Sequence, residues 1–149
     1  MVSMILASAG CLDSLKEDLI SCDNRVGDCR YEILQNGKYS KLHIEISYVS
    51  DNEPSSDALD LLRQRINEVT DKTSVTISQN SFGSTDDSYS LEEIIEIENL
   101  QRERYKNDDE FVIYILYLNG EFEDNDKTLG LAYKGSSFVM FQEKIEDAA

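Results

Sequence analysis

Eight consecutive apolar residues in the second half of the chain place the strongest constraint on its fold. They run from Phe111 to Leu118, and Asn119 and Gly120 follow them. An apolar run without polar residues at alternate positions predicts a strand that is buried on both faces. Such a strand needs neighbours on each side and helices above and below the sheet. The chain is therefore expected to form a layered α/β domain.

The length and charge of the chain limit its organisation and its partners. The 149 residues are enough for one domain with one core. Fourteen basic residues against thirty acidic ones give a net charge of −16 at pH 7. Because phosphate binding needs clustered Lys and Arg, nucleic acid is not expected as a partner. The same charge argues against electrostatic attraction to an anionic membrane surface.

The first ordered elements are expected to begin near Tyr39. Apolar residues at alternate positions from Leu42 to Tyr48 predict a strand with one buried face. His43 and Glu45 fall on the other, polar face, so His43 is expected to be a surface histidine. Helix-start residues at 51–56 then precede an amphipathic helix to Thr70, with an apolar stripe at Ala58, Leu59, Leu62, Ile66 and Val69.

A second strand and a second helix follow. Residues 74–78 are rich in β-branched side chains and predict a short strand, and residues 79–89 predict a polar loop. Ser90 and Glu93 have the spacing of a capping box, which opens a helix to about Tyr105. Its inward-facing residues are expected to be Leu91, Ile94, Ile95, Ile97 and Leu100.

The last elements predict a hairpin: strands at 129–133 and 137–141 joined by residues 134–136. The expected order is therefore β-α-β-α-β-β-β, an α/β (α+β-like) fold with a mixed sheet and two amphipathic helices. This single domain is expected to span residues 39–149. Two alternatives remain for its C-terminal end: a complete domain, or a domain that is truncated there.

The N-terminal segment, residues 1–11, is small and apolar. Ser8-Ala9-Gly10-Cys11 resembles a lipobox, in which small residues precede a cysteine that becomes lipid-modified. It predicts an exported protein held at the cell surface by lipid on Cys11, with no other membrane contact. The alternative is an ordinary N-terminal segment in which Cys11 is a plain thiol.

Residues 12–38 are polar and predict a tether. If Cys11 carries lipid, Cys22 and Cys29 remain as a pair with turn-forming residues between them. A Cys22–Cys29 disulfide would suit an exported protein, and two free thiols would suit a cytosolic one. Both alternatives are open at this point.

The sequence contains none of the catalytic or phosphate-binding motifs considered next. The chain has one histidine, no phosphate-binding glycine loop and no Gly-x-Ser-x-Gly elbow. Carboxylates such as Glu45 are so numerous that pairs of them identify nothing, and a carboxylate-dependent hydrolase is a third, weaker hypothesis. No catalytic residue and no metal ligand is assigned.

A family resemblance appears in the order and spacing of four segments that together cover roughly residues 39–145. The segments are 58–63, 88–93, 114–120 and 129–141, the last containing Leu-Gly-Leu-Ala-Tyr-x-Gly-Ser-Ser. This succession resembles exported zincin-like metalloproteases, and it is similar to their prokaryotic, often lipid-anchored, members. The resemblance implies a zincin-like N-terminal subdomain, which is the first half of a catalytic domain.

The resemblance also implies a substrate-binding strand. Leu129, Gly130, Leu131, Ala132 and Tyr133 would form the edge strand of the sheet, on which a peptide substrate adds as a further strand. Gly130 and Ala132 would leave room for close approach of the peptide. Alternatively, these small residues serve tight packing within the sheet.

The zinc helix of that family, His-Glu-x-x-His, would follow the segment that ends near Ile145, and the sequence does not contain it. Zinc is therefore expected only if the chain continues. Two functions follow as hypotheses. One is a fragment of a zinc-dependent metallopeptidase, inactive as given; the other is a small lipid-anchored extracytoplasmic domain that binds a peptide or protein without catalysis.

Overall fold

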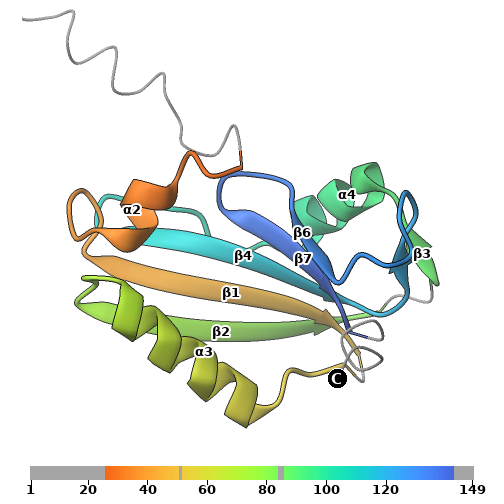
Figure 1. Ribbon diagram of the computed structural model, residues 1–149, viewed down its shortest axis with the longest axis horizontal. Helices are drawn as coiled ribbons and strands as arrows, with labels where there is room; N and C mark the ends of the chain where they lie inside the picture. The colour runs from red at the N-terminus through yellow and green to blue at the C-terminus, as the bar shows by residue number, and fades with distance from the viewer. Residues whose placement is uncertain (1–25, 51, 84–85, 143–149) are drawn as a thin grey trace, which may run out of the picture.

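The computed structural model describes residues 26–50, 52–83 and 86–142. Its centre is a five-stranded sheet in the order β2-β1-β4-β7-β6 (Figure 1). β4 (Glu110–Leu118) lies in the middle, parallel to β1 (Lys41–Val49) on one side and to β7 (Ser137–Phe141) on the other. The continuous apolar run thus forms the central strand, which confirms the prediction from its lack of alternation.

The two outer strands differ in direction. β2 (Ser74–Phe82) runs parallel to β1 at one edge, and β6 (Gly130–Ala132) runs antiparallel to β7 at the other. Two short strands, β3 (Ser88–Tyr89) and β5 (Glu121–Phe122), pair with each other outside this sheet. The main elements follow the predicted order β-α-β-α-β-β-β, and the mixed α/β architecture is confirmed.

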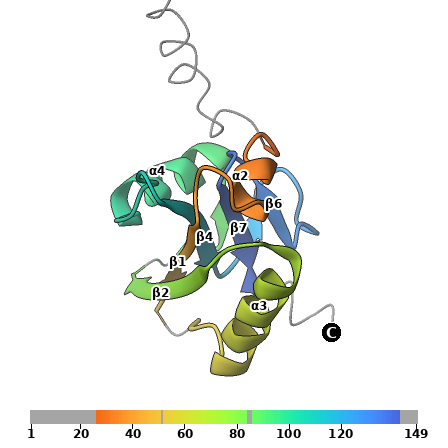
Figure 2. The same cartoon turned by 90° about the vertical axis from the view of Figure 1, so that its left-hand side faces the viewer.

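Helices α3 (Ser56–Val69) and α4 (Leu91–Gln101) lie on opposite faces of the sheet (Figures 1 and 2). On the α3 face, Leu59 and Leu62 pack against a cluster that contains Ile44, Ile46 and Ile115. On the α4 face, the buried core contains Val49, Tyr89, Ile94, Tyr114, Leu116, Leu118, Val139 and Phe141. The sheet is therefore the middle layer of three.

Side-chain caps begin both helices where the sequence predicted them. The Ser55 hydroxyl accepts a hydrogen bond from the backbone N–H of Ala58 at 3.2 Å. Ser90 and Glu93 form the full capping box, because the Glu93 carboxylate also accepts from the backbone N–H of Ser90 at 2.8 Å. These contacts satisfy N–H groups that a helix leaves without an internal partner.

A short helix, α2 (Arg30–Leu34), lies within the segment that was expected to be an irregular tether. Cys29 at its start is fully buried and disulfide-bonded. Cys22, its predicted partner, lies outside the described residues, as does Cys11. Buried Cys29 packs with Tyr39, Leu42 and Phe111. Regular structure that packs on the sheet therefore begins before Tyr39, where the first element was expected.

Several element boundaries differ from the sequence prediction. β2 continues to Phe82, and β3 lies in the remainder of the predicted 79–89 loop. α4 ends at Gln101 rather than near Tyr105, because Arg102 takes extended backbone angles. Leu100 is 80% exposed instead of facing inward, because the buried positions of α4 are Ile94 and Glu98. In the described ranges, no helix is long and apolar enough to cross a membrane.

Candidate functional site

Among the residues that the structure describes, the predicted substrate strand lies at an edge of the main sheet. In this part of the chain β6 pairs with β7 alone, and Gly130 and Ala132 are exposed. Of the other predicted residues, Leu129 is 46% exposed, and Leu131 and Tyr133 are partly buried against the α4-face core. The predicted strand was two residues longer than β6, which spans Gly130–Ala132.

The hydrogen bonds to β7 fix which backbone groups of β6 are open. The N–H of Phe141 donates to the carbonyl of Leu129 at 3.0 Å, and the N–H of Tyr133 donates to the carbonyl of Ser137 at 3.2 Å. In an antiparallel ladder, bonded and non-bonded positions alternate, so Leu131 also belongs to the bonded set. The N–H and C=O groups of Gly130 and Ala132 therefore point away from β7, toward the open edge.

Gly130 and Ala132, the two small residues of β6, are explained by different structural features. A Cβ atom at Gly130 would lie 2.7 Å from the carbonyl oxygen of Val139, so close approach of β6 to β7 requires glycine there. Of the two interpretations of Gly130, this contact supports sheet packing. Ala132 is exposed at the edge and carries the smallest side chain that a non-glycine residue can have.

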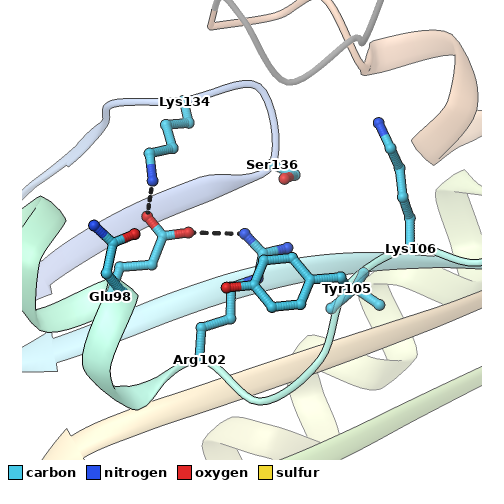
Figure 3. Close-up of a pocket in the computed structure, with 8 residues that line it drawn as sticks. Glu98, Arg102, Tyr105, Lys106, Lys134 and Ser136 are labelled. Atoms are coloured by element: carbon cyan, nitrogen blue, oxygen red, sulfur yellow. Dashed lines mark hydrogen bonds and ion pairs between the residues drawn. The ribbon is translucent and has the colours of Figure 1, made fainter. Parts of the chain in front are cut away.

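A buried carboxylate holds the turn that follows β6. Glu98 is 2% exposed, and its Oε2 accepts from Nζ of Lys134 at 2.7 Å. Its Oε1 accepts from Nη1 of Arg102 at 2.7 Å (Figure 3). The same oxygen accepts from the hydroxyl of Ser137, also at 2.7 Å. We call Glu98, Arg102, Lys134 and Ser137 the Glu98 network. It connects α4 to both ends of the β6–β7 turn.

The electrostatics of the Glu98 network follow from these contacts. Burial alone would raise the pKa of Glu98, but hydrogen bonds from Lys134, Ser137 and Arg102 outweigh it and hold that pKa below its ordinary value. Burial and the nearby Glu98 carboxylate raise the pKa of Tyr133 far above its ordinary range. At neutral pH the carboxylate is therefore ionised and the phenol next to it is neutral.

The sequence analysis did not identify Glu98 as a buried residue. A signal was nevertheless present in the spacing. Glu98 follows buried Ile94 by four positions and precedes Arg102 by four, so all three share one helix face. A carboxylate in an apolar stripe, with a basic side chain one helical turn further along, is typical of a buried ion pair.

His43 is 3% exposed, which corrects the prediction of a surface histidine. Its strand face is covered, and its Nε2 lies 2.8 Å from the hydroxyl of Ser78. Nη1 of Arg104 lies 3.2 Å from Nδ1. Because Arg can only donate, Nδ1 is the acceptor and Nε2 carries the hydrogen. The imidazole therefore has no lone pair facing Ser78, and the Ser78–His43 pair is not a nucleophile with its base. The lone pair of Nδ1 lies 2.8 Å from the hydroxyl of Thr76 and also accepts from Arg104.

Glu45, also expected on a solvated face, is 3% exposed. Its Oε1 accepts from the backbone N–H of Glu103 at 2.7 Å, and its Oε2 accepts from that of Arg104 at 2.9 Å. Both carboxylate oxygens are thus occupied by the segment that leaves α4. This arrangement fixes that segment on β1, and it gives no support to the carboxylate-hydrolase hypothesis.

Within the ranges that the structure describes, no group of three His, Cys, Asp or Glu side chains is placed to hold a metal ion. Comparisons of the chain with protein-family models, with curated proteins and with solved structures found no significant match. The features of the described chain that bear on function are therefore the edge of β6 and its attachment to the Glu98 network.

Proposed function

We propose that this chain is the N-terminal half of the catalytic domain of an exported zincin-like metallopeptidase, and that β6 binds the peptide substrate. In this proposal the zinc ligands and the catalytic base belong to a helix that the sequence does not contain. The chain by itself is then a peptide-binding unit without hydrolytic activity.

The observation that carries this proposal is the open edge of β6. Gly130 and Ala132 direct their backbone N–H and C=O groups away from β7, as the ladder bonds at Leu129 and Tyr133 require. An extended peptide can pair with these groups through main-chain hydrogen bonds, whatever its side chains are. The attachment of Lys134 to Glu98 holds the end of this strand in place.

An apolar groove on the α3 face gives a second line of support. It has a volume of about 230 Å³ and is lined by Ile46, Pro54, Ala58, Leu59, Leu62, Ile115, Tyr117, Phe138 and Met140. It lies over the C-terminal halves of β1, β4 and β7, where the chain leaves the sheet after Phe141. The resemblance implies a zinc helix after the segment that ends near Ile145, and we propose that this helix covers the groove and buries its apolar surface.

Strand addition at β6 is tested by replacing the outward N–H of Ala132. Ala132→Pro removes that donor without touching a bond to β7. We expect it to abolish binding of blocked heptapeptides with alternating apolar and polar residues, measured by NMR titration. Ala132→Val keeps the N–H group and is expected to bind. Equal binding by the Pro and Val variants would exclude strand addition at this edge.

The peptidase part of the proposal has its own test in the gene. The reading frame beyond codon 149 is expected to continue into His-Glu-x-x-His. A stop codon after Ala149 would contradict the peptidase and leave the lipid-anchored binding domain as the function. Metal analysis of the purified chain is expected to find no stoichiometric zinc.

A further inference from the structure

β2 forms the edge of the main sheet opposite to β6. Among the described residues it pairs with β1 alone, over nine residues and in one unbroken parallel register (Figure 1). α3 packs Leu59 over Ile46 and Ile115 of the two inner strands, and α4 lies on the other face (Figure 2). Both helices cover faces of the sheet, so within the described chain neither of them covers the edge of β2.

β2 lacks the features that usually protect an exposed edge strand. It contains no charged residue and no proline, although 44 of the 149 residues (14 + 30) are charged. Its continuous register with β1 has no bulge. β6, by contrast, is only three residues long. Because long edge strands without charges, prolines or bulges pair readily with a further strand, β2 is expected to have a partner.

The bonds to β1 determine which backbone groups of β2 point outward. The carbonyl of Phe82 accepts from the N–H of Ser50 at 2.8 Å, and Phe82 is paired with Val49. Along a strand, residues that bond to one neighbour alternate with residues that bond to the other side. The residues whose N–H and C=O groups face the open edge are therefore Val75, Ile77, Gln79 and Ser81.

Two polar side chains of β2 have complementary hydrogen-bonding groups left over. The hydroxyl of Thr76 donates to Nδ1 of His43 at 2.8 Å, so its oxygen can still accept. Oδ1 of Asn80 accepts from the hydroxyl of Ser47 at 2.9 Å, and Nδ2 of Asn80 has no acceptor among the described residues. Thr76 and Asn80 are each two positions from Ser78, the middle residue of β2.

We propose that β2 pairs antiparallel with β2 of a second copy of this chain, about a twofold axis at Ser78. In this register the outward residues of the two copies meet in hydrogen-bonded pairs, and the two sheets become one. Thr76 then faces Asn80 of the partner subunit in a non-hydrogen-bonded pair, where side chains are closest. The amide of Asn80 donates to the hydroxyl oxygen of Thr76 on each side of the axis. No charge of one strand faces a charge of the other, and both β6 edges stay open.

Analytical ultracentrifugation of the full chain over a range of concentrations tests the proposal. We expect a reversible monomer–dimer equilibrium that strengthens with ionic strength, because each copy has a net charge of −16 and salt screens the repulsion. In hydrogen exchange, the amides of Ile77 and Gln79 are expected to be protected in the dimer alone, and those of Thr76 and Ser78 in the monomer as well. A monomer at all concentrations, or oligomers that grow without limit, would overturn the proposal.

Two matched pairs of variants test the register. Gln79→Pro removes an outward N–H, leaves the bonds to β1 in place and is expected to abolish the dimer, whereas Gln79→Thr keeps the N–H and is expected to form it. Asn80→Asp keeps an acceptor for Ser47 but loses the amide donor, and it remains informative if the proline variant does not fold.

We expect Asn80→Asp to weaken the dimer at least about tenfold, because the donor is lost twice. Asn99→Asp adds the same charge at an exposed position of α4 and is expected to leave the affinity nearly unchanged. Equal dimerisation by the Pro and Thr variants, or equal weakening by the two Asp variants, would overturn the proposal. Peptide binding at β6 is measured separately, so its failure leaves this test unaffected.

Discussion

The ammonium group of Lys134 lies 2.7 Å from Oε2 of Glu98, although 36 positions separate the two residues in the chain. Lys134 follows the edge strand β6 by two residues, and Glu98 is on α4. The same carboxylate also binds Ser137 at the start of β7. One buried side chain on a helix therefore fixes both ends of the turn that positions the proposed peptide-binding strand.

Glu98→Gln is expected to destabilise the protein, because it leaves Arg102 and Lys134 without their buried counter-charge. Losing one partner of such a cluster costs about 3 kcal/mol of unfolding free energy. Urea unfolding measures the loss. Glu96→Gln, at an exposed position of the same helix, is the control and is expected to change stability little. Similar midpoints for the two variants would contradict a stabilising Glu98 network.

Stability is expected to fall as the pH decreases below about 6.5. Burial and the Arg104 guanidinium hold the pKa of His43 below its ordinary value of 6.5. The unfolded chain therefore takes up a proton at a pH at which the folded protein does not, and protonation favours unfolding. This contribution is fully present above pH 6.5 and is lost progressively below it. Urea midpoints measured from pH 8 to pH 5 report the effect.

The carboxylate of Glu98 is expected to affect folding stability in a lower pH range than His43 does. The pKa of Glu98 in the folded protein lies below the ordinary 4.5. The stability that this carboxylate contributes is therefore present above pH 4.5 and is lost as the pH falls through the folded pKa.

His43→Gln is expected to flatten the pH dependence of stability between pH 7 and pH 5 and to leave the loss of stability at lower pH unchanged. An unchanged slope in that variant would show that His43 is not the group responsible.

Lys72 is expected to be essential for holding α2 on the domain. It is 9% exposed, and its Nζ donates to the carbonyl oxygens of Glu32, Gln35 and Tyr39 at 2.5–2.6 Å. Lys72→Met keeps the chain length but leaves three carbonyls without this donor, at a cost of about 2–3 kcal/mol. Chemical unfolding is the measurement, with Lys127→Met at an exposed site as the control. A small effect would mean that water replaces the ammonium group.

Gly120 is expected to tolerate no side chain. Its φ of +75° is in the left-handed region, and a Cβ atom there would overlap the backbone carbonyl of Asp87. The strain of the backbone alone is about 1–2 kcal/mol. Gly120→Ala should therefore lower the urea midpoint clearly. Gly83→Ala is the matched control, because its Cβ would meet no atom of the described residues within 4 Å. Equal midpoints would contradict the close contact with Asp87.

Local patterns in the sequence predicted most of the secondary structure, because periodicity and helix caps depend on nearby residues. The apolar run at 111–118, the alternation at 42–48 and the Ser90–Glu93 capping box each produced the element they predicted. The hairpin at 129–141 was also predicted, and its strands pair antiparallel as expected. These patterns depend on neighbours within a few residues, so they can be read without knowledge of the fold.

The burial of polar side chains could not be predicted from local patterns, because it depends on tertiary contacts. Alternation placed His43 and Glu45 on one face of a strand, but it gave no sign that the segment after α4 covers that face. Glu98 is buried because Lys134 and Ser137, far along the chain, supply donors for it. The position of β6 at the open edge likewise depends on the strand order. Burial and edges arise from contacts between distant segments, and a local pattern does not contain them.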